Sequence, residues 1–348
     1  MKAIHQQIIK YMRLFHVLRI IIACIVAFSV DIIFKLPYGA WAPITIIVVM
    51  SAKYSGEVSD KASQRILGTT IGAILGLSLY FFPVDSVYWH YGLLVVMLCV
   101  SLYFTFGKYS YSAILTSVTL VLVAGSGPGD LHIALWRTTN VLWGGLVAII
   151  ASQYLFPAKA TDHFKLACGD FLRLFHQNYS EHNALVNSDD AYREIQLSQL
   201  RQTLNKLTAL ESSIGHESPK MKVPVKKAIA CQVRMFNLLE NIIQTQWRHQ
   251  YSKEKVQEIR ALSQAKEQLS LMCELLGQDL LAPQKPLMIL NKNQLDILAL
   301  YPKLAPCADS RTDISYYGYL WLNRELARQV ADLSESLCQF ETIKNDAL

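Results

Sequence analysis

The stretch KASQRILGTTIGAILGLSLYFFP, residues 61–83, decides the fold of this chain. After Arg65 it is almost entirely apolar, and glycine recurs at every fourth position, as Gly68, Gly72 and Gly76. A helix needs about 20 mostly apolar residues to cross a bilayer core, and glycines four residues apart let two membrane helices approach closely. The stretch therefore predicts a transmembrane helix over 65–82 with an arginine at its head.

The composition indicates a membrane part followed by a polar part. Of the 348 residues, 52% are hydrophobic and 17% are charged, against about 25% charged residues in soluble proteins. Residues 1–157 contain ten Lys or Arg and five Asp or Glu, whereas residues 158–348 contain 23 and 22. We predict a transmembrane domain, 1–157, and a cytoplasmic helical domain, 158–348. The net charge of +6 lies mostly in the membrane part, which argues against a nucleic-acid partner.

Six apolar runs in the first part are candidate membrane spans: 18–34, 38–52, 65–82, 88–106, 111–124 and 131–156. Pro43 lies in the second run and lacks the N–H that a helix interior needs, so we expect a kink or a break there. The loops on one side are rich in basic residues, and cytoplasmic loops carry such an excess. We therefore expect a multi-pass protein with both termini in the cytoplasm.

The six runs contain a weak internal repeat. With a shift of 72 residues, WAPITIIVVM falls on AILTSVTLVL, and Arg65 and Gly72 fall on Arg137 and Gly144. A repeat of three spans is odd, so the second copy must be inverted relative to the first. We thus predict an all-α protein whose membrane domain is a 3+3 inverted repeat, a plan that recurs in transporters.

Arg65 and Arg137 are the first candidate functional residues. Each could extend its head group to the lipid interface while its stem lies on apolar surface. Alternatively, both could face an inner path and attract an anion, because charges in membrane spans usually face a bundle interior or a water-filled cavity. A guanidinium group also offers a planar fork that matches a carboxylate.

Other residues in the membrane part have two readings each. Asp31 could pair with Lys35, four residues on, or take up and release a proton during coupled transport. Thr45 and Thr69 could donate hydrogen bonds to a substrate or bond their own helix backbone. The small residues Gly68, Gly72, Gly76, Gly144 and Gly145 predict packing seams, within the subunit or at a dimer interface.

The second part predicts amphipathic helices over 160–182, 189–215, 223–250, 253–281 and 314–342, with breaks at HESPK, near Tyr251 and in 282–312. The segment PKMKVPVKK, 219–227, is a basic cluster. It could be a solvated helix start, or it could contact anionic lipid if it lies against the membrane.

The sequence has no signature of an enzyme or of a cofactor site. It contains no HExxH, GxSxG, Walker loop or dinucleotide fingerprint. Its seven cysteines are scattered without a CxxC pair, so neither a disulfide framework nor a metal site is expected. We predict that the chain is not an enzyme and binds no cofactor.

The run WAPITIIVVM and the following KASQRILGTTIGAILG resemble a motif of the fusaric acid resistance (FUSC) and aromatic acid exporter superfamily, which is related to the aluminium-activated malate transporters. In that motif a W-x-x-x-T apolar run precedes R-x-x-G-T-x-x-G. The matching positions here are Trp41, Thr45, Arg65, Gly68, Thr69 and Gly72. The resemblance covers residues 10 to 157 and continues in plan into the helical part.

The resemblance implies export or channelling of organic anions, often aromatic carboxylates, along a path lined by basic residues. We expect an exporter in a bacterial inner membrane, with Arg65, Arg137, Trp41, Thr45 and Thr69 along the substrate path. Its partners would be a small organic anion and the lipid bilayer. Many bacterial members contain two copies of this unit, so a homodimer is expected here. The alternatives are a passive organic-anion channel and a membrane-anchored helical scaffold or sensor.

Overall fold

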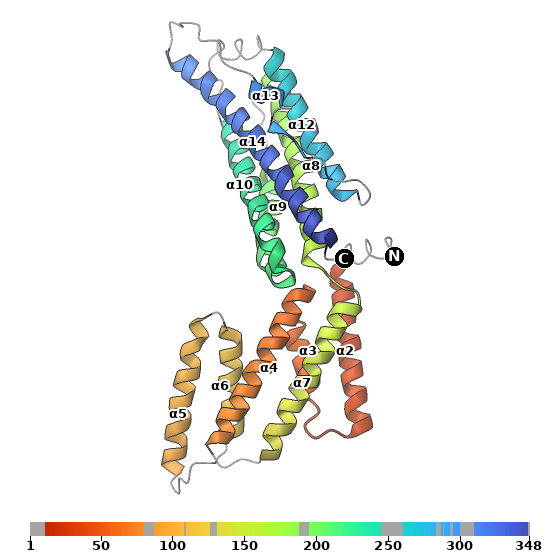
Figure 1. Cartoon of the computed structure of the whole chain (residues 1–348), viewed down its shortest axis with the longest axis vertical. Coiled ribbons are helices and arrows are strands. Elements are labelled where there is room, and N and C mark those ends of the chain that lie inside the picture. Colours follow the sequence, from red (N-terminus) through yellow and green to blue (C-terminus); the bar gives the residue numbers. More distant parts are fainter. Residues whose placement is uncertain are drawn as a thin grey trace. The chain divides into compact units, whose positions relative to one another are not determined.

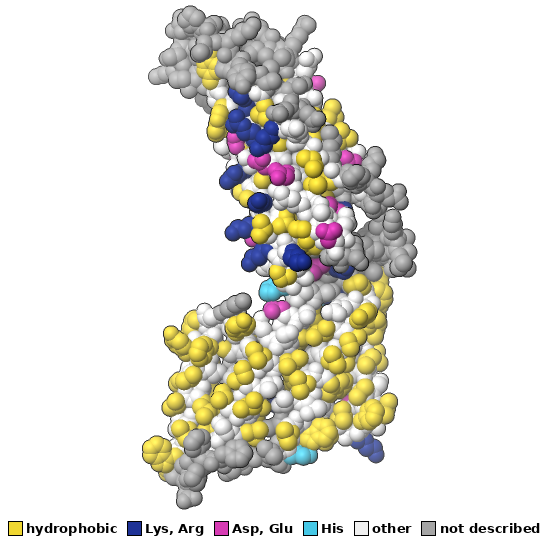
Figure 2. Space-filling model, viewed as in Figure 1, with side chains coloured by type: hydrophobic (Ala, Val, Ile, Leu, Met, Phe, Trp, Pro, Cys, Tyr) yellow, Lys and Arg dark blue, Asp and Glu magenta, His cyan; other side chains and the backbone are white. Residues whose placement is uncertain are grey.

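The computed structural model describes residues 11–79, 87–107, 109–125, 131–187, 195–244, 260–282, 287, 289–292, 295–299 and 310–346. Throughout these residues the regular structure is helical (Figure 1). The chain forms two compact units, Met1–Ala160 and Thr161–Leu348. Hydrophobic side chains cover the visible face of the first unit, whereas Lys, Arg, Asp and Glu side chains gather on the second (Figure 2).

The first unit contains a helix for each predicted span, in the predicted order. These helices are α2 (Met12–Phe34), α3 (Trp41–Val49), α4 (Ser55–Ser78), α5 (Val87–Tyr103), α6 (Ser110–Ala124) and α7 (Leu131–Tyr154), and a 3-10 turn, η1 (Phe104–Phe106), follows α5. Met12–Phe34 and Tyr88–Phe106 are long and apolar enough to cross a membrane, and Ser110–Ala124 is a shorter apolar helix.

The second predicted span forms only a short helix, and its interruption lies before Pro43 and not at it. The helix α3 has nine residues, which extend about 14 Å at 1.5 Å per residue, against a hydrocarbon core of about 30 Å. Pro43 does not kink it, because it lies in the first turn, where a helix leaves the backbone N–H unbonded in any case. The chain is interrupted before α3 instead, where Lys35 and Tyr38 adopt positive φ angles of 47° and 57°.

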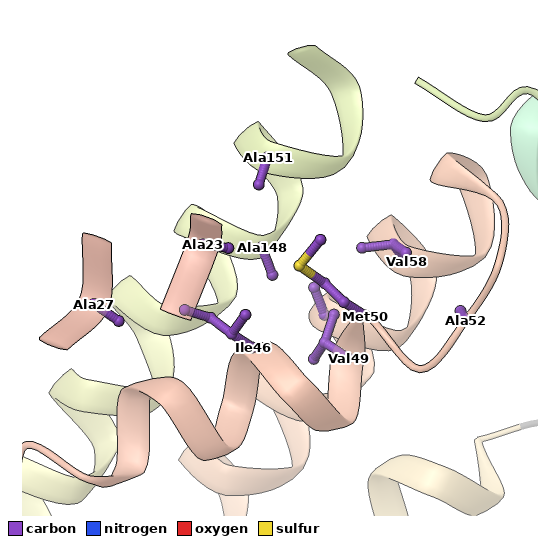
Figure 3. Packing of buried hydrophobic residues seen from close by; sticks show 10 residues of the cluster. Ala23, Ala27, Ile46, Val49, Met50, Ala52, Val58, Ala148 and Ala151 are labelled. Carbon is purple, nitrogen blue, oxygen red and sulfur yellow. The ribbon is translucent and has the colours of Figure 1, made fainter. Parts of the chain in front are cut away.

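The helix α4 begins ten residues earlier than its apolar run. The polar segment SGEVSDKASQ forms its first turns, so Arg65 lies inside a 24-residue helix and not at its head. Side chains of α2, α3, α4 and α7 meet in a buried cluster dominated by alanine and β-branched residues (Figure 3). The small residues of this cluster allow the four helices to approach closely.

Two glycine contacts join the halves of the first unit. A Cβ atom on Gly72 of α4 would stand 2.6 Å from the Thr116 carbonyl oxygen of α6, and one on Gly144 of α7 would stand 2.8 Å from the Ala42 carbonyl oxygen of α3. Thr116 Oγ1 also donates a hydrogen bond to the carbonyl oxygen of Gly68, at 3.1 Å. The third helix of each half therefore packs on the second helix of the other half.

The second unit contains α8 (Ala160–Asn187), α9 (Ser198–Glu217), η2 (Pro219–Met221), α10 (Lys222–Gln244), α12 (Arg260–Leu281), α13 (Asp296–Ala299) and α14 (Ser310–Asp346). The predicted break at HESPK is confirmed, because α9 ends at Glu217 and α10 begins at Lys222. The predicted break near Tyr251 and most of 282–312 lie outside the described residues.

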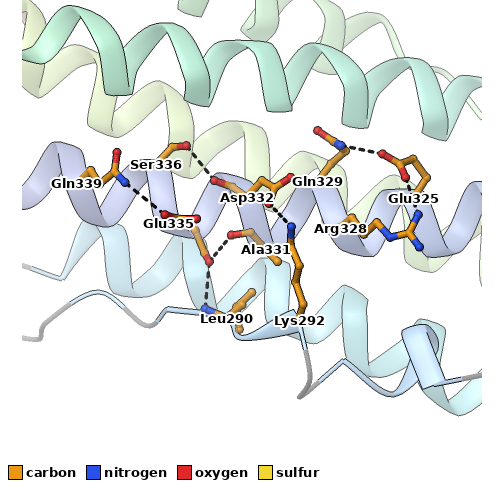
Figure 4. A network of polar contacts seen from close by, with 11 residues as sticks. Leu290, Lys292, Glu325, Arg328, Gln329, Ala331, Asp332, Glu335, Ser336 and Gln339 are labelled. Carbon is orange, nitrogen blue, oxygen red and sulfur yellow. Dashed lines mark hydrogen bonds and ion pairs between the residues drawn. The ribbon is translucent and has the colours of Figure 1, made fainter.

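Polar contacts fasten the segment before α13 to α14 (Figure 4). The Leu290 N–H donates to Ser334 Oγ at 3.0 Å, and Lys292 pairs with Asp332 at 2.7 Å. Arg328 and Glu325 form a further ion pair along α14, at 3.0 Å. The hydrogen bond of Leu290 and the ion pair of Lys292 hold the segment 290–292 against α14.

A buried polar cluster lies between α8, α12 and α14. The Tyr179 hydroxyl donates to Asn323 Oδ1 at 2.6 Å, and the Tyr319 hydroxyl shares a hydrogen bond with His182 Nε2 at 3.3 Å. Burial, together with the nearby Lys266 charge, lowers the pKa of His182 to about 3, so this imidazole is neutral. Lys266 is 2% exposed, and its Nζ stands 5.2 Å from the Tyr319 ring centroid.

We predict that replacing Gly72 weakens the first unit. In Gly72→Ala the new methyl group meets backbone on α6, and such overpacking costs about 1–3 kcal/mol. The matched control is Gly92→Ala, since nothing lies within 4 Å of a Cβ atom there. Thermal unfolding of the full chain in detergent should show a lower melting temperature for Gly72→Ala and an unchanged or slightly raised one for Gly92→Ala. Equal melting temperatures would contradict the close packing of α4 on α6.

We also predict that Lys266 opposes folding below pH 8. Burial lowers the pKa of Lys266 to about 8 from an ordinary 10.5. Between these values the unfolded chain binds more protons, so stability rises with pH, by up to about 3 kcal/mol in all. Lys266→Met should therefore melt higher than wild type at pH 7, and the gap should close towards pH 10.5. The exposed Lys206→Met is the control. A gap independent of pH would disprove a charged, buried Lys266.

Candidate functional site

Two buried arginines contact the short helix α3. Arg65 comes from the interior of α4 and is 7% exposed, and Arg137 comes from α7 and is 6% exposed. Both side chains are therefore enclosed by protein. The helix α3 contributes Trp41 from its first turn and the fully buried Thr45 one turn later.

The side chains of α3 link the two arginines. The Thr45 hydroxyl donates to the Trp41 carbonyl oxygen at 2.7 Å and accepts a hydrogen bond from Arg65 Nε at 3.2 Å. The guanidinium carbon of Arg137 stands 3.8 Å from the centroid of the Trp41 ring, within the range of a cation–π interaction. One short helix thus holds both cations through a hydroxyl group and an aromatic face.

The cluster has an excess of positive charge. The two guanidinium groups are close enough to repel each other, and no carboxylate among the described residues pairs with either. Arg137 Nε is buried without a hydrogen-bond partner. Removing a charge from water is costly unless it is paired, and the guanidinium fork matches a carboxylate. The arrangement is therefore suited to an organic anion.

The backbone before α3 is held by a residue that the sequence reading missed. Asn140, one turn after Arg137, donates from Nδ2 to the carbonyl oxygens of Pro37 at 2.9 Å and Tyr38 at 3.1 Å. Its Oδ1 accepts the Trp143 indole N–H at 3.0 Å. Non-helical backbone at membrane depth requires such partners. In the internal repeat Asn140 aligns with Gly68, and this replacement of a small residue by a polar one was the sequence signal that could have identified Asn140.

The remaining predicted site residues lie outside this cluster of contacts. Thr69 is buried one turn after Arg65 on α4, but no hydrogen bond between described residues joins it to the cluster. Asp31 lies on α2, with its carboxylate packed against Gly39. Within the described residues no ion pair joins Asp31 to Lys35, so the expected local pairing is absent from this structure.

A third buried arginine was also missed. Arg19, which the sequence reading left among the basic residues at the start of the chain, is 1% exposed within α2. Its Nη2 donates to His16 Nδ1 at 2.9 Å and to the Lys53 carbonyl oxygen at 3.4 Å, while Nε and Nη1 are buried without partners. Its position inside an apolar run, just after Val17 and Leu18, was the available signal.

Comparisons with known proteins identify one family and one relative. Residues 21–151, which span α3, α4 and α7 with the arginine cluster, match the family described as fusaric acid resistance protein-like. Over 353 aligned residues the chain is 25% identical to the inner membrane protein YeeA of Escherichia coli (strain K12), with 96% of each chain covered. The region 21–151 of this chain, and with it Trp41, Arg65 and Arg137, therefore belongs to the fusaric acid resistance protein-like family.

Proposed function

We propose that the chain is an inner-membrane exporter of organic anions such as aromatic carboxylic acids. Membership of the fusaric acid resistance protein-like family points to a membrane transport protein rather than an enzyme. The similarity to an inner membrane protein along nearly the whole chain supports the location. The basic loops at one end of the apolar runs support a topology with both termini in the cytoplasm.

One observation carries the proposal. Arg65 and Arg137 are buried in contact with Thr45 and Trp41 respectively, and no carboxylate of the described residues neutralises them. A negatively charged substrate would supply the missing charge, and each guanidinium group could donate two parallel hydrogen bonds to a carboxylate. The single hydrogen bond that Arg65 makes to Thr45 leaves most of its donors for a ligand.

The packing of the two halves supports an inverted repeat around this site. Gly72 of α4 contacts α6, and Gly144 of α7 contacts α3. The third helix of each half therefore packs on the second helix of the other half. In transporters built from inverted repeats, the substrate site lies at the repeat interface and uses interrupted helices. The arginine cluster around the short helix α3 has this position and this kind of helix. We propose that the functional form is a homodimer, because one chain contains a single copy of the unit.

We predict that transport depends on both buried arginines. A suitable probe is 4-sulfobenzoate, an aromatic carboxylate that stays anionic and crosses lipid poorly unaided. Arg65→Gln and Arg137→Gln should each reduce its flux through proteoliposomes by about 10- to 100-fold, the value of a hydrogen bond to a charged group. Arg65→Lys keeps the charge but loses the fork, so it should retain intermediate flux.

The control is Arg13→Gln, which removes an exposed arginine from α2 and should leave flux unchanged. Melting temperatures of the purified variants report whether the fold is retained. If folded Arg65→Gln and Arg137→Gln both transport at the wild-type rate, the arginines have no role in the path.

A second experiment separates an exporter from a passive channel. If Asp31 couples transport to protons, an imposed pH gradient should drive 4-sulfobenzoate against its concentration gradient in wild type. Asp31→Asn should abolish this uphill flux while downhill exchange continues, because the neutral amide can no longer bind and release a proton. Downhill flux in wild type that follows only the membrane voltage would overturn coupling and identify a channel.

A further inference from the structure

An exposed basic surface lies at the turn between α9 and α10. It consists of Lys220, Lys222, Lys226 and Lys227, all exposed, and we call it the basic turn. Val223, in the middle of these lysines, is 61% exposed. The adjoining Met221, Pro224 and Val225 are buried, which fixes the turn to the body of the second unit. The lysine side chains and one apolar side chain thus share a firmly anchored surface.

The charges of the basic turn are not neutralised by the second unit. Among the described residues, none of its four lysines forms an ion pair, whereas Lys165 and Lys344 pair with Glu341 and Asp162 at 3.0 and 2.7 Å. The neighbouring Glu217 is engaged elsewhere, since its carboxylate accepts two hydrogen bonds from Thr161. The basic turn therefore presents an uncompensated positive charge.

Hydrogen bonds within each unit fix the chain on either side of the boundary between the units. Glu217, at the end of α9, accepts hydrogen bonds from Thr161 N at 3.2 Å and Thr161 Oγ1 at 3.0 Å. In the first unit, Ser55 N donates to the Ala158 carbonyl oxygen at 3.1 Å. Only three peptide steps separate Ala158 from Thr161, a span of at most about 11 Å. Within the second unit, the basic turn therefore lies near Thr161, the residue at which the chain enters that unit.

We propose that the basic turn binds the headgroups of anionic phospholipids in the bilayer that contains the first unit. Lysines near an anionic membrane surface are attracted over roughly a Debye length, about 8 Å at physiological salt. Val223 can enter the interface beside them, as apolar side chains of surface-bound helices do. The inference requires α7 to lie in a membrane, but it does not depend on which substrate is transported.

The test is hydrogen exchange of the full chain in lipid nanodiscs made of phosphatidylglycerol or phosphatidylcholine. The amides of residues 220–223 should exchange on the order of fivefold more slowly in the anionic lipid, the value of one lysine at such a surface. The difference should disappear in Lys222→Gln/Lys226→Gln. It should also disappear for the wild-type chain in about 0.5 M salt, because salt screens the attraction between the lysines and the anionic headgroups.

The control variant is Lys206→Gln/Arg234→Gln, which removes two exposed charges from α9 and α10. These positions lie roughly 16–18 Å along the helices from the end of α9 and the start of α10, at 1.5 Å per residue, so the lipid-dependent protection should persist. Equal exchange of residues 220–223 in the two lipids would overturn the proposal, as would protection that survives in Lys222→Gln/Lys226→Gln. Neither outcome bears on anion flux, which the arginine variants test separately.

Discussion

The burial of two like charges, with no acidic partner among the described residues, is the constraint on which the first unit depends. Arg65 and Arg137 repel each other, and the surrounding helices hold them by weak polar contacts alone. The hydroxyl group of Thr45 and the ring of Trp41 supply these contacts. Both come from α3, and its shortness leaves non-helical backbone before it that Asn140 must satisfy. The short helix α3 and the two buried charges therefore depend on each other.

Close packing by glycine makes this arrangement possible. Gly144 lets α7 rest on the backbone of α3 at Ala42, beside Trp41, and Gly72 does the same for α4 on α6. A side chain at either glycine would push the helices apart and with them the arginines that they carry. The glycines therefore serve the cluster indirectly, because they set the separation of the helices.

The sequence predicted the order and approximate extent of the helices, since each follows an apolar run or an amphipathic pattern. The predictions from the sequence were wrong where a helix continues through polar residues or tolerates a proline. The polar residues Ser55–Gln64 continue α4 beyond the apolar run, and Pro43 is harmless because of its place in the first turn. Trp41, Thr45 and Arg65 were found through a motif. The contact of Trp41 with Arg137 depends on tertiary packing, as do the burial of Arg19 and the role of Asn140.

A single hydrogen bond of fixed direction, from Arg65 to Thr45, restrains the Arg65 side chain. A hydroxyl group has one proton, and that of Thr45 is committed to the carbonyl oxygen of Trp41. Its oxygen can therefore only receive from Arg65, through one bond of 3.2 Å. A hydrogen bond to a charged group contributes roughly 1.5–3 kcal/mol, which is the restraint that this bond places on the guanidinium group. Reorienting the Arg65 head group therefore requires breaking only this one hydrogen bond among those between described residues.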